Sequence, residues 1–571
     1  MRSLKPLFLI IAFMAVALRL WGIGFALPDI LHQDEPIIVN HALAYGSGDL
    51  NPHFFIIPPT CSYLLFVVYG LCFCVGIVFG FFSNAADFAR VFFADPTVFY
   101  LMARLVLGFL PSLGSVFLTY RIYMRFFSDR RGAMYASLLS AVAFLNVVNA
   151  HYAYVDNMLV FMVLCACMMF NRVLERHDLK GYLLSAAFIG LAVNVKYNAV
   201  ILLVGLFTAH ILSRRNITDP FTKSTVNRYF LGSFIMLPVV IAITNPFMIF
   251  DGGLFIEQLM KIRSESPGWS HHLLYSLAEG ISWPILAAAF AGIVVAYMKT
   301  DRRRFFLLIG FPVCFYIHLS LKSQLFSRYA LPLIPFLAVY SAYFISNLYA
   351  SVVKKGGVWL KFTATVCVLL VLAPTFVKSV KADLLFSKPD TRSIARKWME
   401  ENLPAKTAVV VDHTSFRPAI FQTKEQIESK KAIAGTENGL EGIKNRKIQM
   451  MSDAIGNKKT FTVYFLNQKG NEEMRFLAQS PTINPSLDEF KEHGVRYVTI
   501  NYNNRDWGND EFLPELKKQA VLIKEFSPYN DGGMRMPKDR IDYTYMPISG
   551  SELFSRCATG PCMAIYMLKD E

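Results

Sequence analysis

The chain has 571 residues, of which 54% are apolar and only 17% are charged, and its formal net charge is +15. Soluble domains contain roughly 25% charged residues, so lipid must solvate a large part of this chain. The Lys and Arg residues fall in short clusters between apolar runs, which is typical of loops that flank membrane helices and argues against a nucleic-acid partner.

The first apolar run, residues 6–27, has no small-residue cleavage site. It predicts a retained membrane helix and not a removed signal peptide. A spanning helix needs ~20 apolar residues, or somewhat fewer among well-packed neighbours. By that measure, further crossings are predicted at 98–120, 132–149, 156–172, 181–195, 197–212, 229–245, 281–297, 305–318, 329–349 and 358–377. The predicted fold is a polytopic α-helical membrane protein of about eleven spans.

Basic clusters orient these crossings, because Lys and Arg gather in the cytoplasmic loops of membrane proteins. Eleven crossings with the N-terminus inside place all five clusters of this chain in the cytoplasm. The clusters are Arg121 with Arg125, Arg130 and Arg131; Arg172 with Arg176 and Lys180; Arg214 with Arg215, Lys223 and Arg228; Lys299 to Arg304; and Lys354 with Lys355 and Lys361.

Residues 61–82 do not fit this scheme, since they are apolar and long enough to span. Counting them as a crossing would put every later basic cluster outside. We therefore interpret residues 29–97 as one large external loop whose apolar part is a re-entrant or juxtamembrane helix pair. Such segments usually line a site, because irregular backbone at membrane depth needs cover from protein or water. An ordinary span followed by a second, unrecognised one is the alternative.

After residue 386 the composition becomes polar, which divides the chain into a membrane domain, 1–386, and an extracytoplasmic domain, 387–571. A helix is predicted at 391–402, with Asp390 as its N-cap and Pro404 beyond its end. The remaining pattern indicates a small α/β domain without a glycine-rich phosphate loop or metal-ligand spacing. Its strands are predicted at 407–412, 461–466 and 497–502, with a helix at 487–493.

Two adjacent carboxylates, Asp34 and Glu35, follow the first helix in the sequence His32-Gln33-Asp34-Glu35-Pro36. Carboxylates beside apolar sequence are costly unless they have a function. Glycosyl transfer with inversion requires one carboxylate to accept the proton of the attacking hydroxyl, and an acidic pair also suits a divalent metal. The simpler alternative is that Asp34 caps a helix begun by Pro36 and that Glu35 is solvated.

A second polar group, Asn149 to Asn157, lies between two predicted spans and includes His151 and Asp156. The predicted topology returns it to the external face that also carries Asp34. An ionisable residue in such a place is a functional-site candidate. The alternative is that Asp156 caps a helix and that His151 belongs to an interfacial aromatic belt.

Several short motifs recur in one order along the chain. They are Leu18-Arg19-Leu20, His32-Gln33-Asp34-Glu35-Pro36, Pro58-Pro59, Arg104, Arg131-Gly132-Ala133, His151-Tyr152-Ala153-Tyr154-Val155-Asp156, Lys196-Tyr197-Asn198-Ala199, Ser327-Arg328-Tyr329-Ala330-Leu331-Pro332, and Asp390-Thr391-Arg392 with Trp398. In these motifs the chain resembles membrane glycosyltransferases of the C superfamily. More narrowly, it resembles the protein-mannosyltransferase-like family (glycosyltransferase family 39), which includes the lipid A aminoarabinose transferase.

The resemblance implies a glycosyltransferase C fold and a polyprenyl-phosphate-sugar donor that enters from the bilayer. Asp34 would be the general base toward the acceptor hydroxyl, Glu35 would assist, and Asp156 would shape the pocket. Fixed cations would receive the charge of the leaving phosphate. The resemblance assigns this role to Arg328, Lys196, Arg104 and Arg19, places His32, His151, Tyr154 and Tyr197 in the substrate pocket, and would give a divalent metal, if one takes part, to Asp34, Asp156 and His151.

The chain also departs from better-known members. It lacks the tandem-Trp acidic motif of oligosaccharyltransferases, of which Asp506-Trp507-Gly508 is only a partial likeness, and it lacks an inserted repeat domain. The sugar, a hexose or a pentose, and the acceptor, a protein, lipid or polysaccharide, therefore stay open. We expect a bacterial plasma membrane enzyme whose site faces outward. A flippase of a lipid-linked sugar and a membrane-anchored binding module are the alternatives, and Cys557 and Cys562 could pair or stay free.

Overall fold

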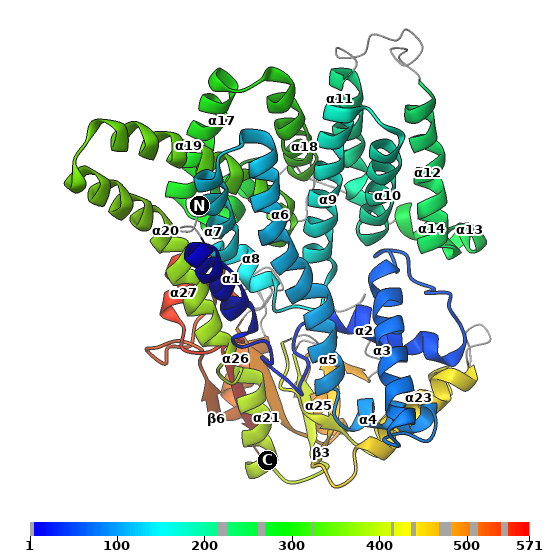
Figure 1. Cartoon of the computed structure of the whole chain (residues 1–571). Coiled ribbons are helices and arrows are strands. Elements are labelled where there is room, and N and C mark those ends of the chain that lie inside the picture. Colours follow the sequence, from blue (N-terminus) through cyan, green and yellow to red (C-terminus); the bar gives the residue numbers. More distant parts are fainter. Residues whose placement is uncertain are drawn as a thin grey trace.

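A computed structural model describes residues 5–213, 227–260, 269–321, 325–412, 416–434, 441–467, 481–502, 512–537 and 546–569. Figure 1 shows a bundle of helices at one end of the molecule and a sheet with its own helices at the other. We call the end with the sheet the domain end and the opposite end the basic end.

Each of the eleven predicted crossings falls on helix. The helices are α1 (Lys5–Leu20), α5 (Thr97–Ala103), η3 (Arg104–Phe109), α6 (Leu110–Phe127), α7 (Arg130–Val142), α8 (Phe144–Asn149), α9 (Val155–Arg176), α10 (Leu179–Val195), η4 (Tyr197–Ile201), α11 (Leu202–Ser213), α12 (Arg228–Thr244), α17 (Trp283–Lys299), α18 (Arg302–Ser320), η7 (Ser327–Leu333), α19 (Ile334–Lys355) and α20 (Val358–Phe386). Between α12 and α17 lie α13 (Phe247–Phe250), α14 (Gly252–Met260), α15 (Trp269–His271), η6 (His272–Leu277) and α16 (Ala278–Ile281).

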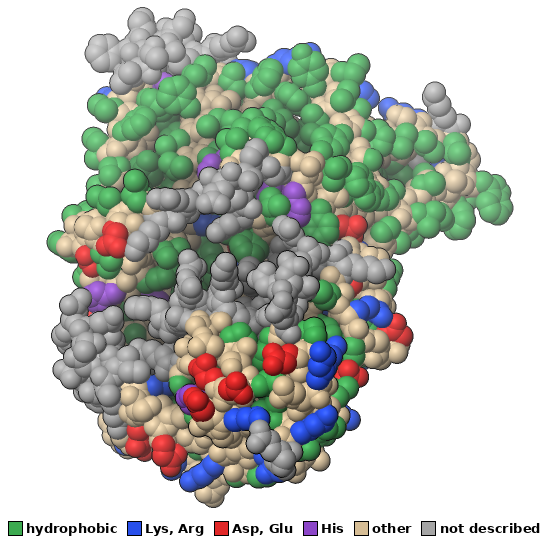
Figure 2. Space-filling view, turned by 180° about the vertical axis from the view of Figure 1, so that it is seen from behind, with side chains coloured by type: hydrophobic (Ala, Val, Ile, Leu, Met, Phe, Trp, Pro, Cys, Tyr) green, Lys and Arg blue, Asp and Glu red, His purple; other side chains and the backbone are tan. Residues whose placement is uncertain are grey.

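Length and hydropathy make this an integral multi-pass membrane protein. Among the described residues, six helices are long and apolar enough to cross a membrane, or up to seven if the bent pair Trp269–Ile281 and Trp283–Lys299 forms one span. Figure 2 shows hydrophobic side chains over much of the bundle and charged side chains gathered on the other end. The number of about eleven spans stays a prediction, because several bundle helices are shorter than a full span.

Two of the basic clusters meet at the basic end. Glu175 lies 3.5 Å from both Arg125 and Arg304, which belong to two different clusters. The turn from α17 to α18 lies at the end of the bundle opposite the sheet (Figure 1). Arg214, Arg215 and Lys223 lie outside the described residues. The grouping agrees with the predicted topology, whereas the compartment that each end faces stays a prediction.

The predicted external loop contains α2 (Glu35–Ala44), η2 (Tyr45–Ser47), α3 (Thr60–Val78) and α4 (Ala85–Ala94). By length and composition α3 could span a membrane. However, it lies beside α5 at the domain end (Figure 1), where Tyr69 donates a hydrogen bond of 3.0 Å to the Phe99 carbonyl. The next helix, α4, packs against α23 (Glu441–Ala454) of the C-terminal domain. The juxtamembrane helix pair stays a prediction, as does the alternative that α3 crosses the membrane.

The C-terminal domain is built on a seven-stranded mixed sheet with the order β2-β3-β1-β5-β7-β6, and β4 pairs with β3. Strands β1 to β5 pair in parallel, while β7 is antiparallel to β5 and β6. The strands are β1 (Ala408–Val411), β2 (Phe421–Gln422), β3 (Thr460–Leu466), β4 (Thr482–Ile483), β5 (Val495–Asn501), β6 (Ala520–Phe526) and β7 (Met563–Leu568). The other helices are α21 (Thr391–Asn402), α22 (Lys424–Ala434), α25 (Leu487–Glu492), α26 (Phe512–Gln519) and α27 (Gly550–Ser555).

The two parts of the chain share a core. Met546, Ile548 and Leu553 of the C-terminal part are buried in the same apolar cluster as the bundle helices. Lys378 of α20 donates a hydrogen bond of 2.7 Å to the Ile548 carbonyl. The composition change after residue 386 therefore marks the boundary between the helical bundle and the C-terminal domain, which pack against each other. Cys557 and Cys562 are both free thiols.

Candidate active site

Four charged side chains meet where helices begin or end at the domain end. Asp34 is the N-cap residue of α2, Asp156 lies in the first turn of α9, and Lys196 follows the last residue of α10. Arg328 is the second residue of η7, the short 3₁₀ helix that leads into α19. The chain changes direction at each of these places, so residues up to 294 positions apart can converge.

Their charges alternate in space. Arg328 Nη2 lies 2.9 Å from Asp34 Oδ2, and Arg328 Nε lies 3.6 Å from Asp156 Oδ2. Lys196 Nζ donates a hydrogen bond of 2.7 Å to Asp156 Oδ1. The Arg328 and Asp156 side chains are 6% and 4% exposed, so water screens this group little. Two carboxylates and two cations thus form one buried network.

Arg328 keeps unused hydrogen-bonding capacity. Its Nε and Nη1 atoms are buried and donate no hydrogen bond to a described residue. Buried donors without a partner are rare in native proteins and commonly mark a place for water, an ion or a ligand. Guanidinium groups match the oxygens of carboxylates and phosphates with two parallel N–H groups. Arg328 is therefore suited to bind an anionic group in addition to Asp34.

The alternative that the two aspartates are ordinary helix caps does not hold. The Asp34 carboxylate makes no capping hydrogen bond to α2, although Pro36 begins that helix as expected. Asp156 is not the N-cap residue of α9, a position taken by Tyr154. Both carboxylates instead face the cations of the network.

Aromatic rings surround the cations. Lys196 Nζ lies 4.1 Å from the ring centre of Tyr329, and the Arg328 guanidinium carbon lies 4.5 Å from Phe326 and 5.3 Å from Tyr154. Cations over ring faces are attracted by the ring quadrupole, more strongly when water is excluded. The structure thus places Tyr154 at the site and adds Tyr329 and Phe326. Their position next to Arg328 in the sequence was the available signal.

Glu35 and Arg104 form a separate pair beside the network. Arg104 Nε and Nη2 donate hydrogen bonds of 2.8 Å to the two oxygens of Glu35, and both side chains are fully buried. The Ala153 amide also donates to Glu35, while Arg104 Nη1 donates to the Ile23 and Phe25 carbonyls. The sequence predicted that Glu35 assists catalysis and that Arg104 binds the phosphate. Neither role fits these contacts, because Glu35 and Arg104 bond to each other and to the backbone of neighbouring loops.

Arg19 lies outside the network as well. Its guanidinium donates to the Ser112 hydroxyl at 2.8 Å and to the Ala141 carbonyl at 2.9 Å, with further bonds to the Ala15 and Ser140 carbonyls. The side chain is fully buried among α1, α6 and α7. Arg19 therefore does not bind the phosphate as predicted. It donates hydrogen bonds to backbone carbonyls near the end of α7 and so has a structural role.

His32 contacts the backbone of the residue that carries the Asp34 carboxylate. Its Nδ1 atom accepts a hydrogen bond of 3.2 Å from the Asp34 amide, and its ring lies 4.4 Å from that of Tyr152. The residue is 1% exposed. His32 therefore fixes the backbone that presents Asp34.

His151 and Tyr197, which the sequence also assigned to the substrate pocket, have other partners. The ring nitrogens of His151 each lie 2.9 Å from a carbonyl, those of Val147 and Trp21, and Asp383 is 3.6 Å away. The Tyr197 hydroxyl donates to the Phe55 carbonyl at 2.9 Å. His151 joins α8 to the end of α1, Tyr197 joins η4 to the first loop, and neither enters the network.

The donor set does not fit a divalent metal. No group of three or more His, Cys, Asp or Glu side chains gathers to hold a metal ion within the described ranges. Asp34 and Asp156 both lie against cations, and His151 points to backbone carbonyls.

Close backbone packing brings the Asp156 segment to the site. A Cβ atom at Gly108 would lie 2.4 Å from the Ala150 carbonyl oxygen and 2.7 Å from that of Tyr152. Only glycine allows this approach. Pro111 follows one turn later and lacks the N–H that would bond to the Leu107 carbonyl, which accounts for the π-helical stretch at residues 104–109.

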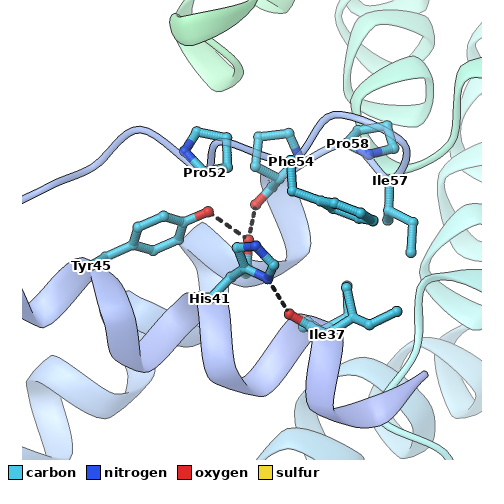
Figure 3. A pocket seen from close by; sticks show the side chains of 10 residues that line it. Ile37, His41, Tyr45, Pro52, Phe54, Ile57 and Pro58 are labelled. Atoms are coloured by element: carbon cyan, nitrogen blue, oxygen red, sulfur yellow. Dashed lines mark hydrogen bonds between the residues drawn. The ribbon is translucent and has the colours of Figure 1, made fainter. Parts of the chain in front are cut away.

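A small pocket lies along α2, beginning one turn beyond Asp34. Figure 3 shows the rings of His41 and Tyr45 on the helix side, facing Phe54 and the prolines of the following loop. The Tyr45 hydroxyl lies 3.0 Å from that of Ser62 within this pocket. It has room for about one water molecule, so it is too small for a sugar ring.

Comparison with protein families supports the motif-based interpretation. The family model described as dolichyl-phosphate-mannose-protein mannosyltransferase matches residues 95–243. The family resemblance is confirmed. The matched stretch runs from α5 into α12 and carries Asp156 and Lys196. No curated protein matches the sequence.

Solved structures of membrane glycosyltransferases are similar over much of the chain. The apo oligosaccharyltransferase of Archaeoglobus fulgidus is 12% identical with a TM-score of 0.47, over 88% of this chain and 70% of that chain. ArnT of Cupriavidus metallidurans bound to undecaprenyl phosphate is 14% identical with a TM-score of 0.46, over 90% of this chain and 96% of its own. The mycobacterial arabinofuranosyltransferase AftD is 13% identical with a TM-score of 0.38, over 100% of this chain and 42% of its own.

Proposed function

We propose that this protein transfers a sugar from a polyprenyl-phosphate carrier to an acceptor hydroxyl at the domain end of the bundle. The observation that carries the proposal is Arg328, a buried arginine between two aspartates with two N–H groups that bond to no described residue. The oxygens of a phosphate are strong acceptors for such charged N–H donors. The family match, whose description names a dolichyl-phosphate sugar, supports this donor class.

In the proposed reaction the acceptor hydroxyl attacks the anomeric carbon while Asp34 accepts its proton. The bond from the anomeric carbon to the phosphate oxygen breaks, and its electron pair leaves with the lipid phosphate. Arg328 and Lys196 stabilise the charge that develops on the phosphate, as preorganised cations do in water-excluded sites. Glu35 is held by Arg104, and Asp156 is held by Lys196 and Arg328, so in this proposal neither of them acts as a nucleophile. A single displacement inverts the anomeric centre.

Donor binding and base release are coupled in this proposal. Without donor, the Asp34 carboxylate faces Arg328 at 2.9 Å. A lipid phosphate that engages Arg328 weakens its hold on Asp34 and so makes this carboxylate available to the acceptor hydroxyl. Asp156 keeps Arg328 and Lys196 in place, since it contacts both. The base thus becomes available only when the donor is bound.

The test is a transfer assay on the purified full chain in lipid vesicles. A radiolabelled polyprenyl-phosphate sugar is added with an envelope extract as acceptor, and lipid-bound label is separated from acceptor-bound label. Transfer from lipid to acceptor supports the proposal. Label that crosses the vesicle membrane with its lipid bond intact would indicate the flippase alternative instead.

The same assay, with donors that differ in sugar, addresses the choice between hexose and pentose. Protein, lipid and polysaccharide fractions of the extract, offered separately, identify the acceptor class. We place the enzyme in a bacterial plasma membrane with its site and C-terminal domain facing the exterior, in agreement with the basic clusters at the opposite end.

A further inference from the structure

The loop that presents Asp34 contains unusual backbone. Ala26 and Ile30 both have positive φ angles, 54° and 50°. For a β-branched residue such as Ile30 this conformation is a true outlier. Strained backbone persists where neighbouring structure holds it firmly, and it is concentrated at functional sites.

The contacts that hold Ile30 come from the C-terminal domain. On one side of it, Asp29 accepts a hydrogen bond from the Ser393 hydroxyl and lies 3.1 Å from Arg396 Nε. On the other side, the Leu31 carbonyl accepts a hydrogen bond of 3.2 Å from Arg392 Nη1. The partners are separated by more than 360 positions in the chain.

These partners all lie on α21, which is fixed in its own domain. Ala395 and Met399 of this helix are fully buried in the apolar cluster of the sheet. At its start, Arg392 makes hydrogen bonds of 2.8 and 2.9 Å to Asp390, and both side chains are at most 2% exposed. Burial alone would raise the pKa of Asp390, but the guanidinium of Arg392 beside it holds that pKa below its ordinary value.

We propose that α21 of the C-terminal domain positions the catalytic base: Arg396 and Ser393 hold Asp29, and Arg392 holds Leu31, so that Asp34 is presented to the substrate. The inference rests on the proposed function. It makes Arg396, Ser393 and Arg392 positioning residues, none of which touches the network of Asp34 and Arg328. The C-terminal domain then contributes to the chemical step and does not merely cover the site.

Reaction geometry explains the expected size of the effect. A reacting group that is displaced by about 1 Å can lose on the order of 100-fold in rate. Release of Asp29 allows the strained Ile30 to relax and moves Asp34, four residues further along. Donor binding depends on Arg328 and Lys196, which are on other elements. We therefore expect the release of Asp29 to lower kcat and to leave the KM for the donor unchanged.

The test compares Arg396→Ala and Asp29→Asn with the matched control Glu400→Ala. Glu400 is the other ion-pair partner of Arg396, at 3.1 Å, and lies one turn further along α21, where its side chain makes no contact with the loop among the described residues. We expect kcat of both loop variants to fall about 10- to 100-fold, with donor KM and Tm near those of wild type. Glu400→Ala is expected to keep wild-type kcat, and the charge exchange Asp29→Arg with Arg396→Asp is expected to restore part of the lost rate.

Hydrogen exchange of peptides covering residues 21–34 gives a second readout. Faster exchange in Arg396→Ala and Asp29→Asn, but not in Glu400→Ala, supports the positioning role even for a variant of reduced stability. Unchanged kcat and unchanged exchange in both loop variants would overturn it, as would an equal loss in Glu400→Ala. If the wild-type protein transfers no sugar, the proposed function itself is wrong. This result differs from failure of the positioning role, in which the wild-type protein is active and the loop variants equal it.

Discussion

The guanidinium of Arg104 and the carboxylate of Glu35 form a two-pronged ion pair, with both hydrogen bonds at 2.8 Å and both side chains fully buried. Asp34, the preceding residue, faces the network around Arg328 instead. Two adjacent carboxylates therefore have different tasks. Glu35 joins the first loop to η3 and to the segment before Asp156, and Asp34 is the carboxylate to which we assign the proposed role of base.

Glu35→Gln tests the structural task. The variant leaves Arg104 charged and buried with only one neutral acceptor in place of a carboxylate, and loss of one partner of a buried pair typically costs about 3–5 kcal/mol. We expect a clearly lower Tm in detergent-solubilised protein. Asp34→Asn is the matched control, because Asp34 makes no capping hydrogen bond to α2 and Arg328 keeps Asp156 beside it when Asp34 is neutralised. A Glu35→Gln protein as stable as wild type but inactive would instead place Glu35 in the reaction.

Lys196 is predicted to act on the leaving group. In Lys196→Met the side chain keeps much of its length but loses the cation 2.7 Å from Asp156. Removal of one such electrostatic group typically costs about 100- to 1,000-fold in rate. We therefore expect single-turnover transfer to fall by that amount. Lys180→Met, at the exposed basic end, serves as the control, and an equal loss there would mean that the effect is general.

Much of the fold follows from the sequence because its signals are local. Apolar runs predicted the helices of the eleven crossings, but the short helices α13 to α16 were not predicted. Asp390 with Pro404 predicted α21 at its observed bounds. Strands β6 and β7 were not predicted. Strand β6 has no alternating pattern, because most of its apolar residues are consecutive, and β7 is buried along most of its length next to a loop-rich segment. The count of spans stays open, because short helices such as α10 and α12 depend on their neighbours.

The site was only partly predictable, since the sequence shows which residues are unusual but not which of them are partners. Buried arginines illustrate this: Arg19, Arg104 and Arg328 look alike in sequence, yet the first two satisfy carbonyls or a carboxylate of the scaffold. Only Arg328 keeps buried donors without a described partner. The role of Asp29 was missed because its partners are on α21, far along the chain.

Sidedness can be measured with single cysteines in a cysteine-free background. Glu515 is exposed on the C-terminal domain and Lys180 is exposed at the basic end. The positive-inside rule predicts that Glu515→Cys reacts with an impermeant thiol reagent from outside the cell and that Lys180→Cys reacts only after permeabilisation. The reverse labelling pattern would mean that the protein has the opposite orientation in the membrane. The contacts within the protein would be the same in either orientation.

Removal of divalent metal should leave transfer intact. Asp34 and Asp156 already lie against Arg328 and Lys196, so a metal ion would have to displace both cations. We expect the rate in excess chelator to equal that in magnesium or manganese, after dialysis to remove bound ions. A rate that is lost on chelation and restored by one metal would show that the network rearranges around an ion when substrates bind.

Asp34→Asn and Arg328→Lys together separate the base from the phosphate site. Asp34→Asn keeps the shape of the side chain but cannot accept a proton, and general-base catalysis contributes about 100- to 10,000-fold. We expect single-turnover transfer to fall by at least about 100-fold, with donor affinity little changed. Arg328→Lys keeps one charge but loses the planar fork of N–H groups, so donor affinity should fall together with the rate.

The two variants should therefore differ in saturation behaviour, which a donor titration under single-turnover conditions measures directly. Excess donor is expected to recover part of the rate of Arg328→Lys, because more of that variant becomes occupied, whereas it cannot restore proton acceptance in Asp34→Asn. Thermal unfolding of both variants excludes misfolding as the cause. A well-folded Asp34→Asn enzyme with near-normal turnover would remove Asp34 as the base. Asp156 would then be the remaining carboxylate of the network, because Glu35 is enclosed by Arg104 and the Ala153 amide.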